Sequence, residues 1–96
     1  MSDRERPTIH FSELAPAPPD SLFHTEWELY RREVGRLIAE GHEGKWALIK
    51  GEDIVGLFDT EEQALDVRAE RFFRQPVLVQ QVLTRAPVLL ITPRHI

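Results

Sequence analysis

Residues 44–64 read GKWALIKGEDIVGLFDTEEQA and contain two short apolar runs that determine the expected fold. The runs, at residues 46–50 and 54–58, are bounded by turn residues, which predicts two strands. Gly51 and Glu52 form a two-residue connection that begins with glycine, as is typical of a type II′ turn. We therefore expect an antiparallel hairpin in which Lys50 faces Asp53.

The same turn predicts the register of the hairpin. Counting outward from Lys50 and Asp53, Ile49 faces Ile54, Leu48 faces Val55, Ala47 faces Gly56 and Trp46 faces Leu57. Side chains alternate between the two faces of a strand, so these residues divide into two apolar sets. One face carries Ala47, Ile49, Ile54, Gly56 and Phe58, and the other carries Trp46, Leu48, Val55 and Leu57.

A helix and a third strand are expected after the hairpin. Thr60 and Gln63 have the spacing of a capping box, which predicts a helix that runs to about Arg74. Small side chains at Ala47 and Gly56 would let this helix approach that face of the sheet, with Leu65, Ala69, Phe72 and Phe73 pointing inward. Residues 77–83 predict a strand, and a right-handed crossover sets it parallel to the second strand, in the order second, first, third.

A longer helix is expected before the hairpin, from residue 22 or 26 to residue 40. Apolar residues recur there at spacings of three and four. Thr25 and Glu28 have capping-box spacing, and Gly41 can supply a left-handed residue at the other end. This helix could cover the Trp46 face of the sheet, or both helices could share one face and leave the other for a partner.

The two ends of the chain differ from its middle. Residues 1–20 contain four prolines among charged and small residues, which predicts a flexible Pro-rich tail. Ile9, Phe11 and Leu14 could nevertheless dock part of this tail on a neighbour. Residues 88–92 read VLLIT, and an apolar run of this kind either adds a fourth strand to its own sheet or pairs with another chain.

These expectations describe one α+β domain at residues 21–96. Its element order is α-β-β-α-β(-β), with an antiparallel hairpin, a crossover helix and a mixed sheet of three or four strands. The 96 residues leave no room for a second domain. A chain of this length buries only about 60 to 65% of its unfolded surface, so self-association is an expected further source of stability.

Composition excludes several kinds of chemistry. The chain has no cysteine, which excludes thiol catalysis, disulfides and thiolate metal sites. Its net charge of −4 argues against non-specific nucleic-acid binding, which needs an excess of Lys and Arg. The chain has no signal-peptide apolar region and no run of about 18 apolar residues, so we expect a cytoplasmic protein with no membrane partner.

No set of residues has the spacing of a known catalytic or metal site. The glycines of residues 44–56 lack the spacing of a phosphate-binding loop. His24 and Glu28 are four residues apart on the first helix, but no third metal ligand is evident. His42, Glu43 and Lys45 share a loop, so a small enzyme or ligand-binding site at this loop is one alternative. We predict no catalytic, cofactor-binding or metal-binding residue.

Arginines on the two helices raise a second alternative, a nucleic-acid-associated regulator. If the helices are adjacent, these side chains could form a stripe that meets an anionic partner. Glutamates at spacings of three and four favour pairing along each helix instead. The arginines are Arg31, Arg32, Arg36, Arg68, Arg71 and Arg74.

The stretch EGHEGKWALIKGEDIVGLFDTEEQAL, preceded by YRREVGRLIAEG and followed by RFFRQPVLVQQV, resembles a group of small uncharacterised bacterial proteins. The shared pattern is a Gly-Lys-Trp strand, a Lys-Gly-acid turn, an Ile-Val-Gly strand and an acid-rich helix that begins with Asp-Thr. It spans about residues 27–82. The resemblance implies a small α+β domain with no established activity, ligand or cofactor. The sequence departs from the pattern at RFFRQP, where a glycine often follows the aromatic residue.

The leading functional hypothesis is a non-enzymatic protein-interaction module that self-associates and acts as an accessory to a larger protein. Trp and aliphatic side chains on one hairpin face have the composition of a binding hot spot, and residues 88–92 add a second apolar segment. We expect a homo-oligomer or a protein partner, no cofactor and no nucleic acid. The predicted interaction residues are Trp46, Leu48, Val55, Leu57, Val88 and Leu90.

Overall fold

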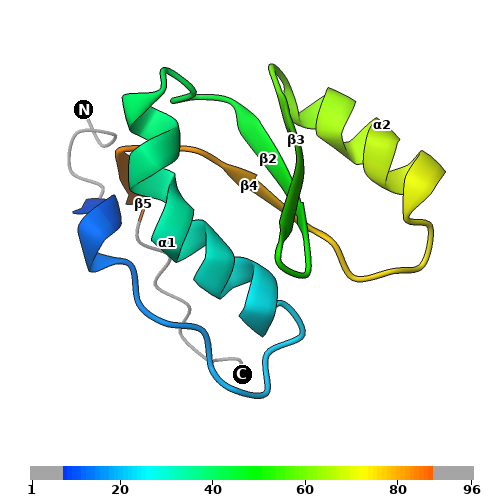
Figure 1. Cartoon of the computed structure of the whole chain (residues 1–96), viewed down its shortest axis with the longest axis horizontal. Coiled ribbons are helices and arrows are strands. Elements are labelled where there is room, and N and C mark those ends of the chain that lie inside the picture. The colour runs from blue at the N-terminus through cyan, green and yellow to red at the C-terminus, as the bar shows by residue number, and fades with distance from the viewer. Residues whose placement is uncertain (1–7, 88–96) are drawn as a thin grey trace, which may run out of the picture.

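The predicted hairpin lies at the centre of the structure (Figure 1). The computed structural model describes residues 8–87, and these form the α+β domain that the sequence predicts. The main sheet has the order β3-β2-β4, as predicted, and a second sheet pairs β1 with β5. All neighbouring strands are antiparallel, so the main sheet is antiparallel and not mixed. The elements are β1 (Thr8–His10), the 3₁₀ turn η2 (Phe11–Glu13), α1 (His24–Ala39), β2 (Trp46–Lys50), β3 (Asp53–Phe58), α2 (Glu61–Arg71), β4 (Leu78–Gln81) and β5 (Arg85–Pro87).

The predicted hairpin register holds beside the turn and is wrong beyond it. The pairing shifts by one residue and leaves Val55 as an extra residue in β3. A bulge of this kind moves all later side chains of its strand to the opposite face. Leu57 therefore shares a face with Ala47 and not with Leu48. The observed pairs are Lys50–Asp53, Ile49–Ile54, Leu48–Gly56, Ala47–Leu57 and Trp46–Phe58.

Gly56, which follows the bulge, leaves room for the Phe58 ring. The Phe58 ring folds back over this residue, and a Cβ atom at position 56 would lie only 2.9 Å from the ring. Any side chain at this position would displace the ring. The alternation of apolar residues along the strand does not indicate such a contact. The sequence therefore predicts regular pairing without a bulge.

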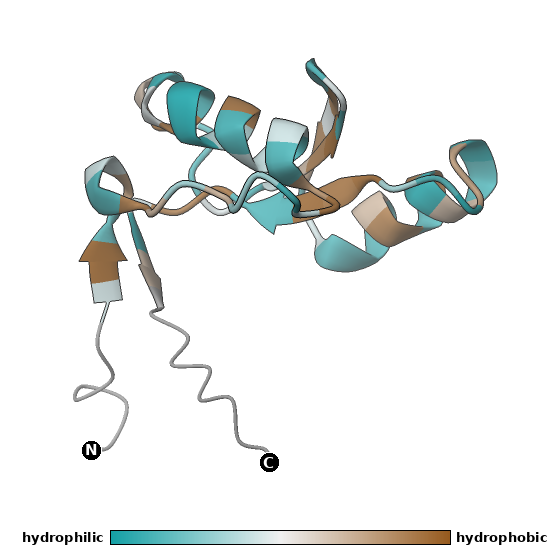
Figure 2. Cartoon of the chain, turned by 90° about the horizontal axis from the view of Figure 1, so that it is seen from below, coloured by the Kyte–Doolittle hydropathy of each residue, from teal (hydrophilic) through white to brown (hydrophobic). Residues whose placement is uncertain are grey.

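The two helices cover opposite faces of the main sheet (Figure 2). The prediction that α2 lies over Ala47 is wrong, because α1 packs there and α2 lies on the face of Leu48. The long apolar stripe of α1 needs the larger surface, whereas Ala64 is the buried residue of α2. The main core, on the α1 side, comprises Leu29, Tyr30, Val34, Leu37, Ala47, Ile49 and Val82.

α2 begins as predicted and ends early. Its capping box between Thr60 and Gln63 is confirmed. The helix ends at Arg71, and Arg74, the predicted end, has a left-handed backbone with a φ of 70°. The chain therefore leaves the helix before Phe73 can turn toward the sheet. Of the predicted inward stripe, Leu65 and Phe72 are half-buried, and Ala69 and Phe73 are exposed.

The start of α1 is not capped as predicted. Its N-cap residue is Phe23, which makes no side-chain cap bond. Glu28, expected to complete a capping box with Thr25, instead accepts the N–H of Ala17 at 2.9 Å. At the other end, Gly41 follows the helix with a φ of 93°, in the left-handed region that the sequence predicts.

Residues 11–18 pack along α1, whereas the sequence predicts a flexible tail to residue 20. The indole Nε1 of Trp27 donates to the carbonyl of Ala15 at 2.8 Å, and Arg31 Nε donates to the carbonyl of Leu14 at 3.1 Å. Phe11 and Leu14 also pack against the main core. Side chains of α1 thus hold a segment whose own composition favours an extended, mobile chain.

The second sheet is formed by residues that the sequence assigns to the tail and to the end of the chain. Ile9 of β1 faces Ala86 of β5, and the two strands form a ribbon at one end of the main sheet (Figure 2). Residues 88–92, predicted to form a fourth strand or to pair with another chain, lie outside the described residues. Their pairing stays a prediction.

A buried carboxylate links α1 to the hairpin turn. Glu26 is 7% exposed, and its Oε2 accepts the N–H of Gly51 at 2.7 Å. Gly51 has a φ of 60° at the first central position of the turn, in agreement with the type II′ geometry expected. A bond from a turn amide to a carboxylate is stronger than a neutral one, so it fixes the turn against α1.

The substitution Glu26→Ala is expected to lower the free energy of unfolding by about 1 to 3 kcal/mol, because the partly buried N–H of Gly51 then loses its acceptor. Glu26→Gln keeps an oxygen that can accept this bond and should lose less. Urea unfolding followed by tryptophan fluorescence measures both changes. An Ala variant as stable as the wild type would contradict this role of Glu26.

Candidate interaction sites

β4 is an edge strand with outward-facing backbone groups. Val82 N–H donates to the carbonyl of Lys45 at 2.8 Å, so Val82 faces β2. Backbone groups alternate sides along an antiparallel strand, and those of Val79 and Gln81 therefore face away from β2. The Tyr30 hydroxyl donates to the carbonyl of Gln81 at 3.0 Å from this outer side. Within residues 8–87, the outward N–H and carbonyl of Val79 and the outward N–H of Gln81 accept or donate no backbone hydrogen bond.

A groove beside this edge contains Trp46. The volume of this groove is about 510 Å³. Trp27 stacks on Tyr30 with ring centroids 5.5 Å apart and is bonded to Ala15, so this wall is held in place. We name this hollow the edge groove. Its apolar lining includes Ile9, Leu14, Trp27, Trp46, Val79 and Leu83.

The predicted interaction residues do not form one surface. Trp46 is half-buried in the edge groove, whereas Leu48 is fully buried on the α2 side. The bulge turns Leu57 toward the main core and leaves Val55 outside the paired register. Val88 and Leu90 lie outside the described residues. Trp46 therefore lines a groove, but without the neighbours that the sequence predicts.

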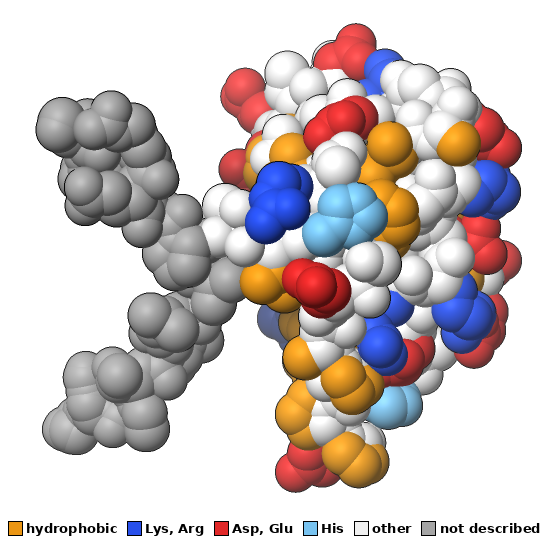
Figure 3. Space-filling view, turned by 90° about the vertical axis from the view of Figure 1, so that its left-hand side faces the viewer, with side chains coloured by type: hydrophobic (Ala, Val, Ile, Leu, Met, Phe, Trp, Pro, Cys, Tyr) orange, Lys and Arg blue, Asp and Glu red, His pale blue; other side chains and the backbone are white. Residues whose placement is uncertain are grey.

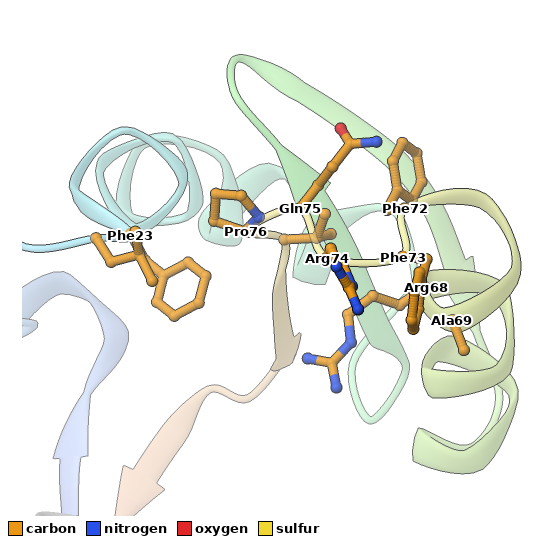
Figure 4. Close-up of a pocket in the computed structure, with 10 residues that line it drawn as sticks. Phe23, Arg68, Ala69, Phe72, Phe73, Arg74, Gln75 and Pro76 are labelled. Carbon is orange, nitrogen blue, oxygen red and sulfur yellow. The ribbon is translucent and has the colours of Figure 1, made fainter.

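A second hollow lies between the start of α1 and the end of α2. In Figure 4, Phe23 faces the α2 side across it, and arginine side chains extend into the intervening space. The hollow has a volume of about 600 Å³. Leu22 and Phe73, which line it, are 71% and 70% exposed. We name it the arginine cleft, lined by residues that include Leu22, Phe23, Arg68, Phe73, Arg74 and Pro76.

Arginines beside this cleft stack on aromatic rings. The guanidinium carbon of Arg74 lies 5.3 Å from the Phe73 ring centre, and that of Arg71 lies 5.3 Å from the Phe72 ring centre. Ion pairs between described residues do not involve Arg68, Arg71 or Arg74. The sequence pattern does not reveal this cleft, because it assigns both phenylalanines to the buried stripe of α2.

The side chains of the predicted His42, Glu43 and Lys45 site diverge. Glu43 accepts the N–H of Thr84 at 3.0 Å, near the start of β5. Lys45 Nζ lies 2.6 Å from Asp59, at the end of β3. His42 approaches the C-terminal end of α1. These contacts connect neighbouring elements and do not bring the three side chains to one pocket.

Three carboxyl groups have a lowered pKa for local reasons. The backbone N–H of Thr84 stabilises the charged form of Glu43 and lowers its pKa. A hydrogen bond from the Lys45 ammonium lowers the pKa of Asp59. The N–H of Ala17 lowers the pKa of Glu28 in the same way. Each shift comes from a bond that ties two segments of the chain together.

Metal and membrane sites are not found within residues 8–87. His24 Nδ1 lies 3.1 Å from the carbonyl of Pro18, and Glu28 binds Ala17 and Arg31, so this pair does not chelate together. No group of three or more His, Cys, Asp and Glu side chains there could hold a metal ion. Neither described helix combines the length and the apolar character needed to cross a membrane.

The helix arginines do not form one stripe. Arg31 lies 2.7 Å from Glu28, and Arg36 lies 2.6 Å from Glu33, as the spacing predicts. Acidic and basic side chains are interspersed on the face shown in Figure 3. Arg68 and Arg71 belong to α2, which covers the other side of the sheet, and Arg71 stacks on Phe72.

The chain matches no protein-family model, no curated protein and no solved structure. Its resemblance to small bacterial proteins over residues 27–82 stays a prediction. The edge groove and the arginine cleft are therefore the candidate interaction sites.

The substitution Glu43→Gln is expected to make stability less sensitive to acid. A lowered folded pKa means that Glu43 contributes stability above its unfolded pKa of about 4.3, and that this is lost as the pH falls through the folded value. The variant lacks this titration, so its melting temperature should fall less between neutral and acidic pH. Thermal unfolding followed by circular dichroism measures the difference. A variant with the acid sensitivity of the wild type would contradict the Thr84 bond.

Proposed function

We propose that this protein is a non-enzymatic interaction module that self-associates through the edge of β4. The observation that carries this proposal is the set of open backbone groups beside the edge groove, namely the N–H and carbonyl of Val79 and the N–H of Gln81. Exposed strand edges pair readily with other strands. Two β4 strands related by a twofold axis would pair antiparallel and join two sheets into one.

The β4 edge suits this pairing better than the β3 edge. β3 contains the irregularity at Val55, and a bulge twists an edge strand and disrupts its pairing. β4 instead pairs with β2 in an unbroken register from Leu78 to Gln81. Its outer edge is therefore straight enough to accept another strand.

The edge groove supports the proposal by adding apolar surface to the backbone bonds. A strand that adds to a sheet gains affinity from main-chain bonds and specificity from pockets for its side chains. Trp27 and Trp46 line the groove, and tryptophan is enriched among the residues that dominate binding energy. A twofold arrangement would bury each groove against the edge of the other copy.

The substitution Val79→Pro is expected to convert a dimer into a folded monomer. Proline removes the outward N–H of Val79, while the bonds to β2 come from the neighbouring residues and remain. Size-exclusion chromatography with light scattering, at tens of micromolar protein, should give a dimer for the wild type and a monomer for the variant. Circular dichroism verifies that the variant is folded.

Val79→Ala is the matched control, because it shortens the side chain and keeps the N–H. This variant should remain dimeric. A monomeric wild type at the same concentration would contradict the proposal. A dimer that survives Val79→Pro but is lost in the double variant Val88→Glu, Leu90→Glu would assign self-association to residues 88–92 instead of β4.

A further inference from the structure

We propose that the arginine cleft is a second binding site, and that its ligand is an apolar segment of another protein that carries acidic side chains. The site ends at Val77, just before β4, and within residues 8–87 it shares no lining residue with the edge groove. It would therefore bind a partner whether or not the protein self-associates.

The apolar half of the cleft consists of large side chains left open to solvent. Leu22 and Phe73 are the large apolar residues with the greatest exposure in the described chain, at 71% and 70%. They belong to different segments, yet both line the same hollow, together with Phe23 and Pro76. A single exposed leucine is ordinary, but a patch gathered in a hollow is typical of an interaction site.

The arginines of the cleft favour a partner that carries negative charge. Arg68 and Arg74 line the hollow, and no aspartate or glutamate among residues 8–87 lines it. Arg74 rests on the face of Phe73. A stacked guanidinium keeps the donors on its edge free, and these match the two oxygens of a carboxylate. Glutamate or aspartate beside an apolar anchor would satisfy both halves of the site.

A protein segment fits this cleft better than a nucleic acid does. Nucleic-acid sites combine stacking aromatic rings with a continuous basic track for the phosphates. Here three phenylalanines offer rings for stacking, but the described lining has only two arginines, set among leucine, alanine, valine and proline side chains, which do not make a continuous basic track. The net charge of the chain is −4, which also opposes a polyanion more than a short acidic segment.

Fluorescence anisotropy with labelled synthetic peptides tests the proposal. The first peptide alternates Phe and Leu with Glu, and two matched peptides replace every Glu by Gln or by Lys. The Glu peptide should bind the wild-type protein, the Gln peptide more weakly, and the Lys peptide most weakly. A labelled single-stranded oligonucleotide serves as the nucleic-acid probe.

Cleft variants and a matched control locate the binding. Phe73→Ala should weaken binding of the Glu peptide about tenfold, as expected when an anchoring residue is truncated. Leu22→Ala is a second variant at the opposite wall, and both changes are at exposed positions that leave the fold intact. Arg68→Gln should also weaken binding, whereas Arg32→Gln, which removes the same charge from α1, should not.

The outcomes separate this proposal from its competitors. No binding of the Glu peptide, or equal binding to the wild type, Phe73→Ala and Arg68→Gln, would overturn it. Tight binding of the oligonucleotide that is lost in the same variants would assign the cleft to nucleic acid instead. Light scattering should show that Phe73→Ala keeps the oligomeric state of the wild type, so failure of this proposal is distinguishable from failure of β4 pairing.

Discussion

β2 is bonded along both edges and buried on both faces, and the rest of the structure is positioned by it. Ala47, Leu48 and Ile49 have no exposed surface. Ala47 and Ile49 belong to the core under α1, and Leu48 points to the opposite side. A strand that is buried on both faces cannot alternate polar and apolar residues, so its sequence is a continuous apolar run. This run requires two covering helices, and it explains why they lie on opposite sides of the sheet.

Features encoded by local chemistry could be predicted from the sequence. Gly51 marks the hairpin turn, and Thr60 with Gln63 marks the start of α2, because each acts through atoms only a few residues away. Strand order follows from the crossover that α2 makes after β3. The bulge at Val55 could not be predicted, because alternation of apolar residues gives no sign of an extra residue in the strand. The docking of residues 11–18 likewise depends on side chains of α1.

The two candidate sites also differ in whether they could be predicted from the sequence. Trp46 could be singled out because a tryptophan on a strand with two apolar faces needs a cover, and the structure places it beside the open edge of β4. The arginine cleft could not be predicted, because it exists only where α2 ends at Arg71. Had the helix continued, Phe73 would have continued its inward stripe. A difference of one helical turn thus separates a core residue from a surface anchor.

Pairing at β4 and binding at the arginine cleft would together allow a dimer to bind one partner at two clefts. The edge groove and the arginine cleft share no lining residue within residues 8–87, so pairing at β4 would leave the arginine cleft of each copy open. A twofold dimer would then present two identical clefts. A partner with two acidic, apolar segments could bind both, and the second contact would form at the high effective concentration set by the linker between them. Loss of β4 pairing would weaken such a partner even though every cleft residue stayed intact. Self-association would therefore raise the affinity for such a partner by bringing two clefts together in one dimer. The clefts themselves would not change.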